Sequence, residues 1–262
     1  MAAEKPTLVL VPGSFVPPSF YTNVISAFSS KGYSIQAVDT CTVGKKPGAP
    51  PTMYDDAAHI ASVVSKLADE GKDIVLVAHS YGGIPTSESL KGLSKDTREK
   101  EGKKGGVVRV AYMTAVVPEL EENSAAVFSV LGDQAPSAYT AVDEDGWMFH
   151  PTPEITAGYV FSDLSPEEGL KWVNKFEQHS VVSFTNELTY AGYKDVPVSY
   201  LFCEEDKCVP PMVQQRCIDV IEKASGRNVD VTRVKNDHCP SVSAPEKVVD
   251  WFVHLVEIGG KA

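Results

Sequence analysis

One serine of this sequence stands where the nucleophile of an enzyme could stand. The segment 79–82 follows the apolar run 74–78, which is typical of a strand buried on both faces. The small residues Ala78 and Gly82, two places before and after Ser80, permit a sharp turn from a strand into a helix. Such a turn would raise the hydroxyl above the sheet, although a serine at this place is also a common helix cap.

A candidate acid and a candidate base each follow a predicted strand nearer the C-terminus. The strand predicted over 196–203 leads into Asp206, and the strand predicted over 228–234 leads into His238. The carboxyl ends of parallel strands share one edge of a sheet, where ligands bind. A serine needs a base, and the base needs an acid that orients it, so this chain order predicts a catalytic triad with Ser80 as nucleophile.

Other residues compete for these roles. Glu205 adjoins Asp206 and is a rival acid, whereas Asp237 is expected to hold its own loop. His79 lies beside the nucleophile but is expected to point the opposite way. Among the remaining histidines, His150 is one that could touch a substrate.

An acyl-transfer site also needs backbone donors for the oxyanion that forms during the reaction. One expected donor is the N–H of Tyr81, because it lies at the start of a helix, where N–H groups are free and the helix dipole favours negative charge. The loop after the predicted strand 7–11 should supply the second donor, from Ser14 or Phe15. Gly13 allows this loop to turn, and its single glycine argues against a phosphate-binding loop.

The elements that must position these residues alternate between strands and helices on both sides of an irregular block. This pattern predicts an α/β fold with a six-stranded, mostly parallel sheet flanked by helices. We assign 1–117 and 195–262 to the core, and 118–194 to a cap inserted at one edge of the sheet. The charged run 95–104 mixes both signs and is interpreted as a solvated loop.

Composition excludes several classes of function. A formal net charge of −11 disfavours a face that binds nucleic acid. No apolar run is long enough to span a membrane, and no basic-then-apolar leader precedes the first strand. The five cysteines have no zinc-type spacing, so we expect reduced thiols, a cytoplasmic location and no bound metal. Cys208 and Cys239 lie near the predicted triad, and their roles stay open.

Several motifs resemble the α/β-hydrolase superfamily, in particular the plant methylesterase and hydroxynitrile lyase group and its fungal and bacterial relatives. The matching segments span nearly the whole chain: 9–14, 77–83, 161–164, 188–191, 201–211 and 237–240. The resemblance implies an α/β-hydrolase fold, and it supports Asp206 over Glu205 as the acid. Two departures occur in this chain: Pro12 stands where the family often has histidine, and Gly13 and Cys239 replace residues typical of cyanogenic lyases. The second departure weighs against cyanohydrin cleavage.

The expected function is a cofactor-independent serine hydrolase for a small, largely apolar ester, lactone or thioester. The aromatic residues of the predicted cap motivate the apolar substrate, and the candidate contacts are Trp147, Met148, Phe149 and His150. One alternative is a lyase or cyclase in which His238 is the base. Another alternative is a non-catalytic receptor. A small molecule is the expected partner, and the sequence specifies neither its identity nor the oligomeric state.

Overall fold

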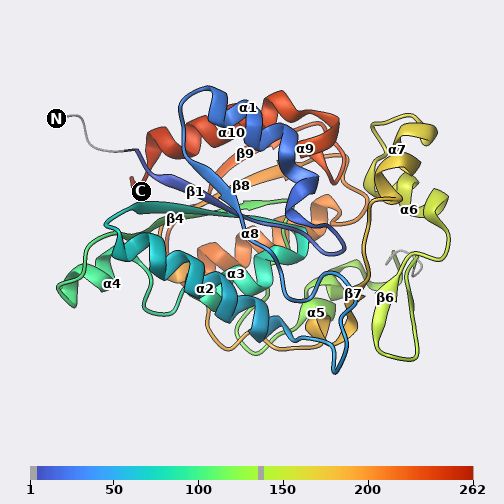
Figure 1. The fold of residues 1–262 in the computed structure, drawn as a ribbon, viewed down its shortest axis with the longest axis horizontal. Coiled ribbons are helices and arrows are strands. Elements are labelled where there is room, and N and C mark those ends of the chain that lie inside the picture. The colour runs from blue at the N-terminus through green and yellow to red at the C-terminus, as the bar shows by residue number, and fades with distance from the viewer. Residues whose placement is uncertain (1–4, 135–138, 262) are drawn as a thin grey trace.

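A parallel six-stranded sheet forms the centre of the computed structural model, which describes residues 5–134 and 139–261 (Figure 1). The order of its strands is β2-β1-β3-β4-β8-β9, and every neighbouring pair is parallel. The strands are β1 (Thr7–Val11), β2 (Ile35–Ala37), β3 (Asp73–His79), β4 (Gly106–Met113), β8 (Val198–Cys203) and β9 (Asp230–Val234). The predicted α/β-hydrolase architecture is confirmed.

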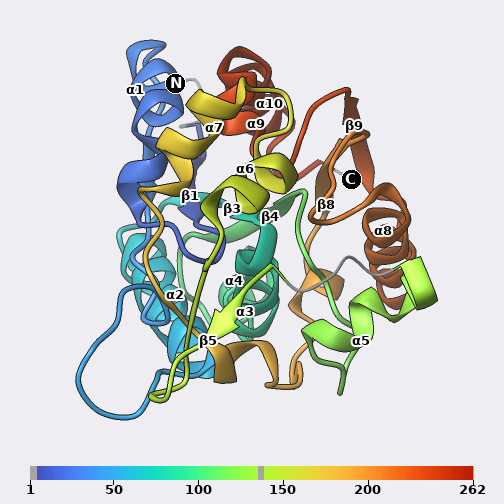
Figure 2. The same cartoon turned by 90° about the vertical axis from the view of Figure 1, so that its right-hand side faces the viewer.

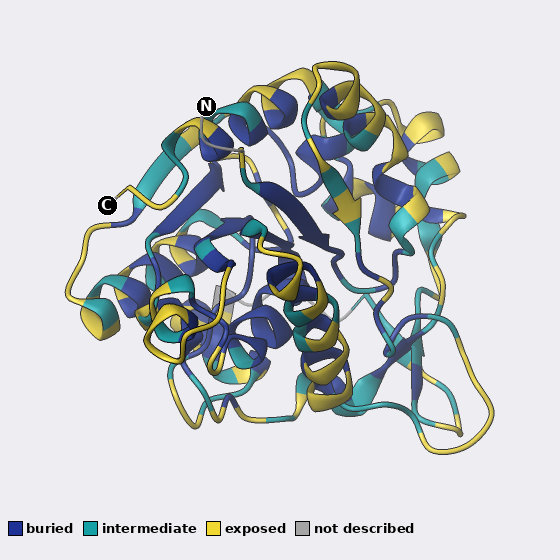
Figure 3. Cartoon of the chain, turned by 60° about the vertical axis from the view of Figure 1, so that its left-hand side comes forward, coloured by how far each residue is buried: buried dark blue, intermediate teal, exposed yellow. Residues whose placement is uncertain are grey.

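Helices cover both faces of this sheet. One face carries α1 (Thr22–Ser30), α9 (Pro240–Ser243) and α10 (Pro245–Ile258), and the other carries α2 (Met53–Asp69), α3 (Gly83–Ser89) and α8 (Pro211–Ser225) (Figure 1). Because side chains alternate along a strand, Leu8 and Leu10 pack with α1 and α10, whereas Val9 and Val11 pack with α2. The inner strands β1, β3, β4 and β8 are therefore buried on both faces, whereas the edge strands β2 and β9 are partly exposed. The helices expose their outer surfaces (Figure 3).

The charged run 95–104 contains a helix, α4 (Lys95–Lys100), so its interpretation as a solvated loop is wrong. The side chain of Ser94 caps the helix by accepting a hydrogen bond from the N–H of Thr97. Arg98 is only 4% exposed and donates to a carboxylate oxygen of Asp69, at 2.6 Å. The alternation of acidic and basic residues in the sequence gave no sign that Arg98 would be buried and paired with Asp69.

The segment 118–194 leaves the sheet after β4 and returns at β8. These two strands pair with each other inside the sheet, so the segment lies over the carboxyl ends of the strands and not beside an outer strand (Figure 2). Its helices are α5 (Ser124–Phe128), α6 (Pro153–Val160) and α7 (Pro166–Val173), and its strands β5 (Ala141–Val142), β6 (Trp147–Phe149) and β7 (His179–Ser180) form a small antiparallel sheet. The division into a core and an inserted cap stays a prediction.

Short 3-10 helices occur at several turns of the chain. They are η1 (Pro18–Tyr21), η2 (Ser80–Gly82), η3 (Ser129–Gln134, broken at Gly132), η4 (Val181–Phe184) and η5 (Gly192–Lys194). Within the described residues, no helix is both long enough and apolar enough to cross a lipid bilayer.

Candidate active site

Ser80 occupies a strained turn between β3 and α3. Its φ angle is +52°, in the left-handed region, which costs a non-glycine residue about 1–2 kcal/mol. The turn is also crowded: a Cβ added at Gly82 would lie 2.4 Å from the backbone oxygen of Pro12, and one added at Gly83 would lie 2.5 Å from that of Val116. The two glycines are therefore what allows the strand and the helix to meet at Ser80.

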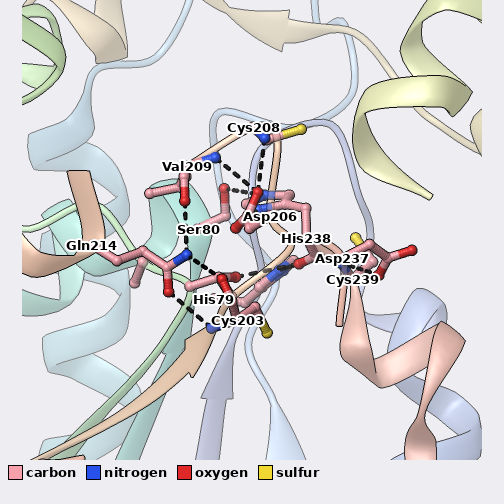
Figure 4. A network of polar contacts seen from close by, with 12 residues as sticks. His79, Ser80, Cys203, Asp206, Cys208, Val209, Gln214, Asp237, His238 and Cys239 are labelled. Carbon is pink, nitrogen blue, oxygen red and sulfur yellow. Dashed lines mark hydrogen bonds and ion pairs between the residues drawn. The ribbon is translucent and has the colours of Figure 1, made fainter. Parts of the chain in front are cut away.

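The three predicted triad residues form a continuous hydrogen-bonded chain (Figure 4). Ser80 Oγ lies 2.9 Å from His238 Nε2, and His238 Nδ1 lies 2.8 Å from Asp206 Oδ2. All three residues are buried, with 3–9% of their surface exposed. Since a carboxylate only accepts, His238 donates through Nδ1–H, and its Nε2 is free to take the hydroxyl proton of the serine.

Asp206 is the acid that the structure places against His238. Its second oxygen, Oδ1, accepts the backbone N–H groups of Cys208 and Val209 at 2.7 and 2.9 Å (Figure 4). Glu205 is exposed, although its backbone N–H bonds to the carbonyl of Asn236. Donors on both oxygens fix the orientation of the Asp206 carboxylate.

Gln214, on α8, braces the loop that carries Asp206. Its side-chain oxygen accepts the N–H of Cys203 at 3.0 Å, and its amide nitrogen donates to the carbonyls of Cys203 and Val209, both at 2.8 Å. A lone glutamine in a predicted helix gave no sign of this role in the sequence.

Asp237 holds the loop of His238, as expected. Its Oδ1 accepts the N–H of Cys239 and the hydroxyl of Ser243, and its Oδ2 accepts the N–H of Asp163. Burial is the main cause that raises the pKa of its carboxyl group. Asp163 belongs to the segment 118–194, so this contact also ties that segment to the loop after β9.

The loop after β1 is held from the segment 118–194. Phe15 has a φ of +66°; its carbonyl accepts the N–H of Glu177 at 2.8 Å, and its N–H donates to His179 Nδ1 at 3.4 Å. Because the N–H of Phe15 already has a partner, the arrangement favours Ser14 over Phe15 as an oxyanion donor. Ser14, Phe15 and Tyr81 all line one cavity with Ser80.

His179 is fully buried between these two regions. The hydroxyl of Ser183 donates to the carbonyl of Ser180 at 2.8 Å, so it must accept from His179 Nε2–H, which lies 3.0 Å away. Nδ1 is then the acceptor that Phe15 needs. Burial lowers the pKa of His179 to about 3, which keeps the ring neutral and fixes these roles at neutral pH.

The cavity beside Ser80 has a volume of about 250 Å³ and mostly apolar walls. Its walls include Met148 and His150, but Trp147 and Phe149 do not line it. These two residues lie outside this cavity, and their contact with a substrate stays a prediction. The reason for their position is the alternation of side chains along β6, and Trp147 lies instead by the loop 45–48.

Most of the aromatic wall was not identified from the sequence. It is contributed by side chains from separate elements of the chain: Phe15, Phe128, Tyr139, Phe176 and Phe184. No local pattern connects them, because only the folded backbone brings them to one place. His79, expected to point away, also borders the cavity, and its ring centre lies 5.0 Å from that of His238.

Cys208 and Cys239 line the same cavity as free thiols. Burial is the largest cause that raises both pKa values well above the ordinary range, and nearby carboxylates act in the same direction. Asp206, Cys208 and His238 place potential metal-ligand atoms within 4.8 Å of one another. However, a neutral thiol is a poor ligand, and the Asp206 and His238 atoms are already hydrogen-bonded, so this donor set fits a triad better than a metal site.

The parallel sheet, the strained strand-to-helix turn at Ser80 and the order of the surrounding elements define an α/β-hydrolase fold. A sequence profile of the alpha/beta hydrolase family matches residues 8–251. The chain belongs to this family.

Known proteins of similar sequence or structure extend along nearly the whole chain. A protein from Phoma sp. named "Probable hydrolase R7" is 37% identical, over 96% of this chain and 98% of its own length. Methylesterase 1 of Arabidopsis thaliana is 24% identical, over 97% of each chain. The crystal structure of a pyrethroid hydrolase from Sphingobium faniae JZ-2 is similar with a TM-score of 0.72 at 19% identity, covering 96% of this chain and 97% of its own. The predicted resemblance to methylesterases and to fungal relatives is confirmed.

Proposed function

We propose that this protein is a serine hydrolase that cleaves a small, largely apolar ester, lactone or thioester without a cofactor. The observation that carries the proposal is the continuous chain of hydrogen bonds from Ser80 through His238 to Asp206, at 2.9 and 2.8 Å, beside an apolar cavity. Each atom in this chain has the partner that proton transfer from the serine requires.

In the first half of the reaction, Ser80 Oγ attacks the carbonyl carbon while its proton passes to His238 Nε2. The carboxylate of Asp206 stabilises the imidazolium that forms. Negative charge develops on the carbonyl oxygen, where the N–H groups of Tyr81 and Ser14 are the proposed donors. The tetrahedral intermediate then collapses, and the alcohol or thiol leaves with the proton from His238 Nε2.

The second half repeats these steps with water. The acyl group is now bound to Ser80 Oγ, and His238 Nε2 takes a proton from a water molecule that attacks the acyl carbon. Collapse of the second intermediate breaks the acyl–serine bond, returns the proton to Ser80 and releases the acid.

The aromatic cavity supports an apolar substrate, and its volume of about 250 Å³ supports a small one. The names of the relatives also support ester hydrolysis, since one relative is a methylesterase and one structural relative is a pyrethroid hydrolase. All five cysteines are free, which supports the proposed cytoplasmic location.

Turnover of p-nitrophenyl esters by Ser80→Ala and the unmodified protein tests the proposal. We expect the substitution to lower kcat by about four orders of magnitude or more, whereas Ser26→Ala, on the exposed face of α1, should change it less than about twofold. Full activity of Ser80→Ala would refute the assignment. Ester turnover too slow to measure, together with no labelling of Ser80 by a fluorophosphonate in the folded protein, would instead favour the lyase or cyclase alternative.

A further inference from the structure

A second hydrogen-bonded chain lies beneath the triad and has no part in the reaction steps above. The N–H of Gly13 donates to the hydroxyl oxygen of Tyr21 at 3.1 Å. That oxygen lies 2.7 Å from His79 Nδ1. On the other side of the ring, His79 Nε2 lies 2.9 Å from the backbone oxygen of His238. Tyr21 and His79 are only 1% and 2% exposed, so water does not compete for these bonds.

This chain can run in only one direction. The carbonyl of His238 can only accept, so His79 Nε2 carries a hydrogen and donates it. In the neutral ring Nδ1 is then an acceptor, and the hydroxyl of Tyr21 must donate to it. The oxygen of that hydroxyl is left to accept from Gly13. Burial, and secondarily the proximity of His238, lower the pKa of His79 to about 3, so the ring is neutral wherever the enzyme would work.

The two ends of the chain hold the two groups that must act on the same substrate atoms. At one end Gly13 precedes Ser14, and a Cβ at Gly13 would lie 3.1 Å from both His79 Nδ1 and Ser80 Cβ. The loop therefore rests directly on the nucleophile's turn. At the other end the carbonyl of His238 receives a further donor, the hydroxyl of Thr114, at 3.2 Å.

We propose that Tyr21 and His79 are positioning residues that fix the oxyanion-donating loop and the base His238 at a set separation around Ser80. This inference rests on the proposed function, because it assigns Ser14 and His238 their roles in acyl transfer. Displacement of a reacting group by about 1 Å can lower a rate by about 100-fold. His79 borders the cavity, but its apolar walls are formed mainly by aromatic side chains from other residues, so binding of the substrate's apolar part should change less. Loss of the chain should therefore affect the transition state more than the bound substrate.

The test compares Tyr21→Phe, His79→Leu and the double variant. We expect each single variant to lower kcat by about 10- to 100-fold with KM changed less than about threefold. The affinity for a trifluoromethyl ketone, which forms a tetrahedral adduct with the serine, should fall by the same factor as kcat/KM. Because the two side chains act in one chain, the double variant should be no slower than the slower single variant.

The matched control is Tyr112→Phe. Tyr112 is also fully buried, and its hydroxyl lies 2.8 Å from Ser87 Oγ, outside the chain that runs through His79. Tyr112→Phe should lower the melting temperature about as much as Tyr21→Phe, but it should leave kcat unchanged.

Two results would overturn the inference: wild-type kcat and ketone affinity in Tyr21→Phe, or effects of the two single variants that multiply in the double variant. If His79→Leu does not fold, Tyr21→Phe alone still decides, since it removes one hydroxyl and keeps the ring. Ser80→Ala belongs in the same series. Full activity of Ser80→Ala would refute the proposed function, whereas an inactive Ser80→Ala beside a fully active Tyr21→Phe would refute only the positioning role.

Discussion

The two sides of Ser80 are built in different ways. On the side of the sheet, the loops after β3, β8 and β9 bring polar groups together, and each has a defined partner, as the 2.9 and 2.8 Å contacts of His238 illustrate. On the opposite side, the segment 118–194 presents mainly aromatic and aliphatic side chains to the cavity, among them Phe128, Phe176 and Phe184. Polar partners fix angles and proton positions, whereas apolar walls fix size and shape. We therefore expect the sheet side to govern the chemistry and the segment 118–194 to govern the choice of substrate.

The largest effect should come from the sheet side. Asp206→Asn keeps the shape of the side chain but removes the negative charge that, in the proposed mechanism, stabilises the His238 imidazolium. The amide group can also donate to His238 Nδ1 and so favour the tautomer with its hydrogen on Nε2, which cannot accept the serine proton. We expect kcat to fall by about 10³- to 10⁴-fold. Glu205→Gln, one position away and exposed, is the matched control and should change kcat less than about twofold. Equal losses in the two variants, measured by ester turnover, would contradict the assignment of the acid.

An intermediate effect, on the pH dependence of stability and not on kcat, is expected at His179, where the two regions meet. Its pKa of about 3 in the folded protein lies below the ordinary value of 6.5, so the unfolded chain binds the extra proton between these limits. Stability from this group is complete above about pH 6.5 and is lost as the pH falls, by up to about 1.4 kcal/mol per pH unit. His179→Asn should therefore make the free energy of unfolding less dependent on pH between 6.5 and 4.

Denaturant unfolding at several pH values measures this slope. His59→Gln is the control, because His59 is exposed on α2 and should leave the slope as it is in the unmodified protein. A slope for His179→Asn as steep as that of the unmodified protein would mean that His179 is not a buried neutral group.

The residues on the sheet side of the site could be predicted from the sequence better than those of the segment 118–194, for a physical reason. An apolar run typical of a strand precedes each of Ser80, Asp206 and His238. Because neighbouring parallel strands end at the same edge of a sheet, the pattern of strands alone predicts that these residues lie close together. The contacts of Tyr21 with His79 and of His179 with Phe15 depend on packing between distant segments, which no local pattern encodes. Four consecutive residues, 147–150, were expected to contact a substrate, but strand alternation sends only Met148 and His150 to the cavity.

The smallest effect on activity is expected from substitutions in β6. One face of this strand lines the cavity and the other does not, so neighbouring residues can be compared directly. Met148→Ala removes part of the cavity wall, so we expect kcat/KM for short acyl esters to fall by about three- to tenfold while longer acyl chains lose less. Phe149→Ala, the next residue along the strand, removes a larger side chain that does not line the cavity. It should leave the preference for acyl length unchanged, even if it lowers the melting temperature more. A series of p-nitrophenyl esters of increasing acyl length measures both variants. A shift in preference caused by Phe149→Ala and not by Met148→Ala would reverse the assignment of the two faces, and with it the role given to this part of the segment 118–194.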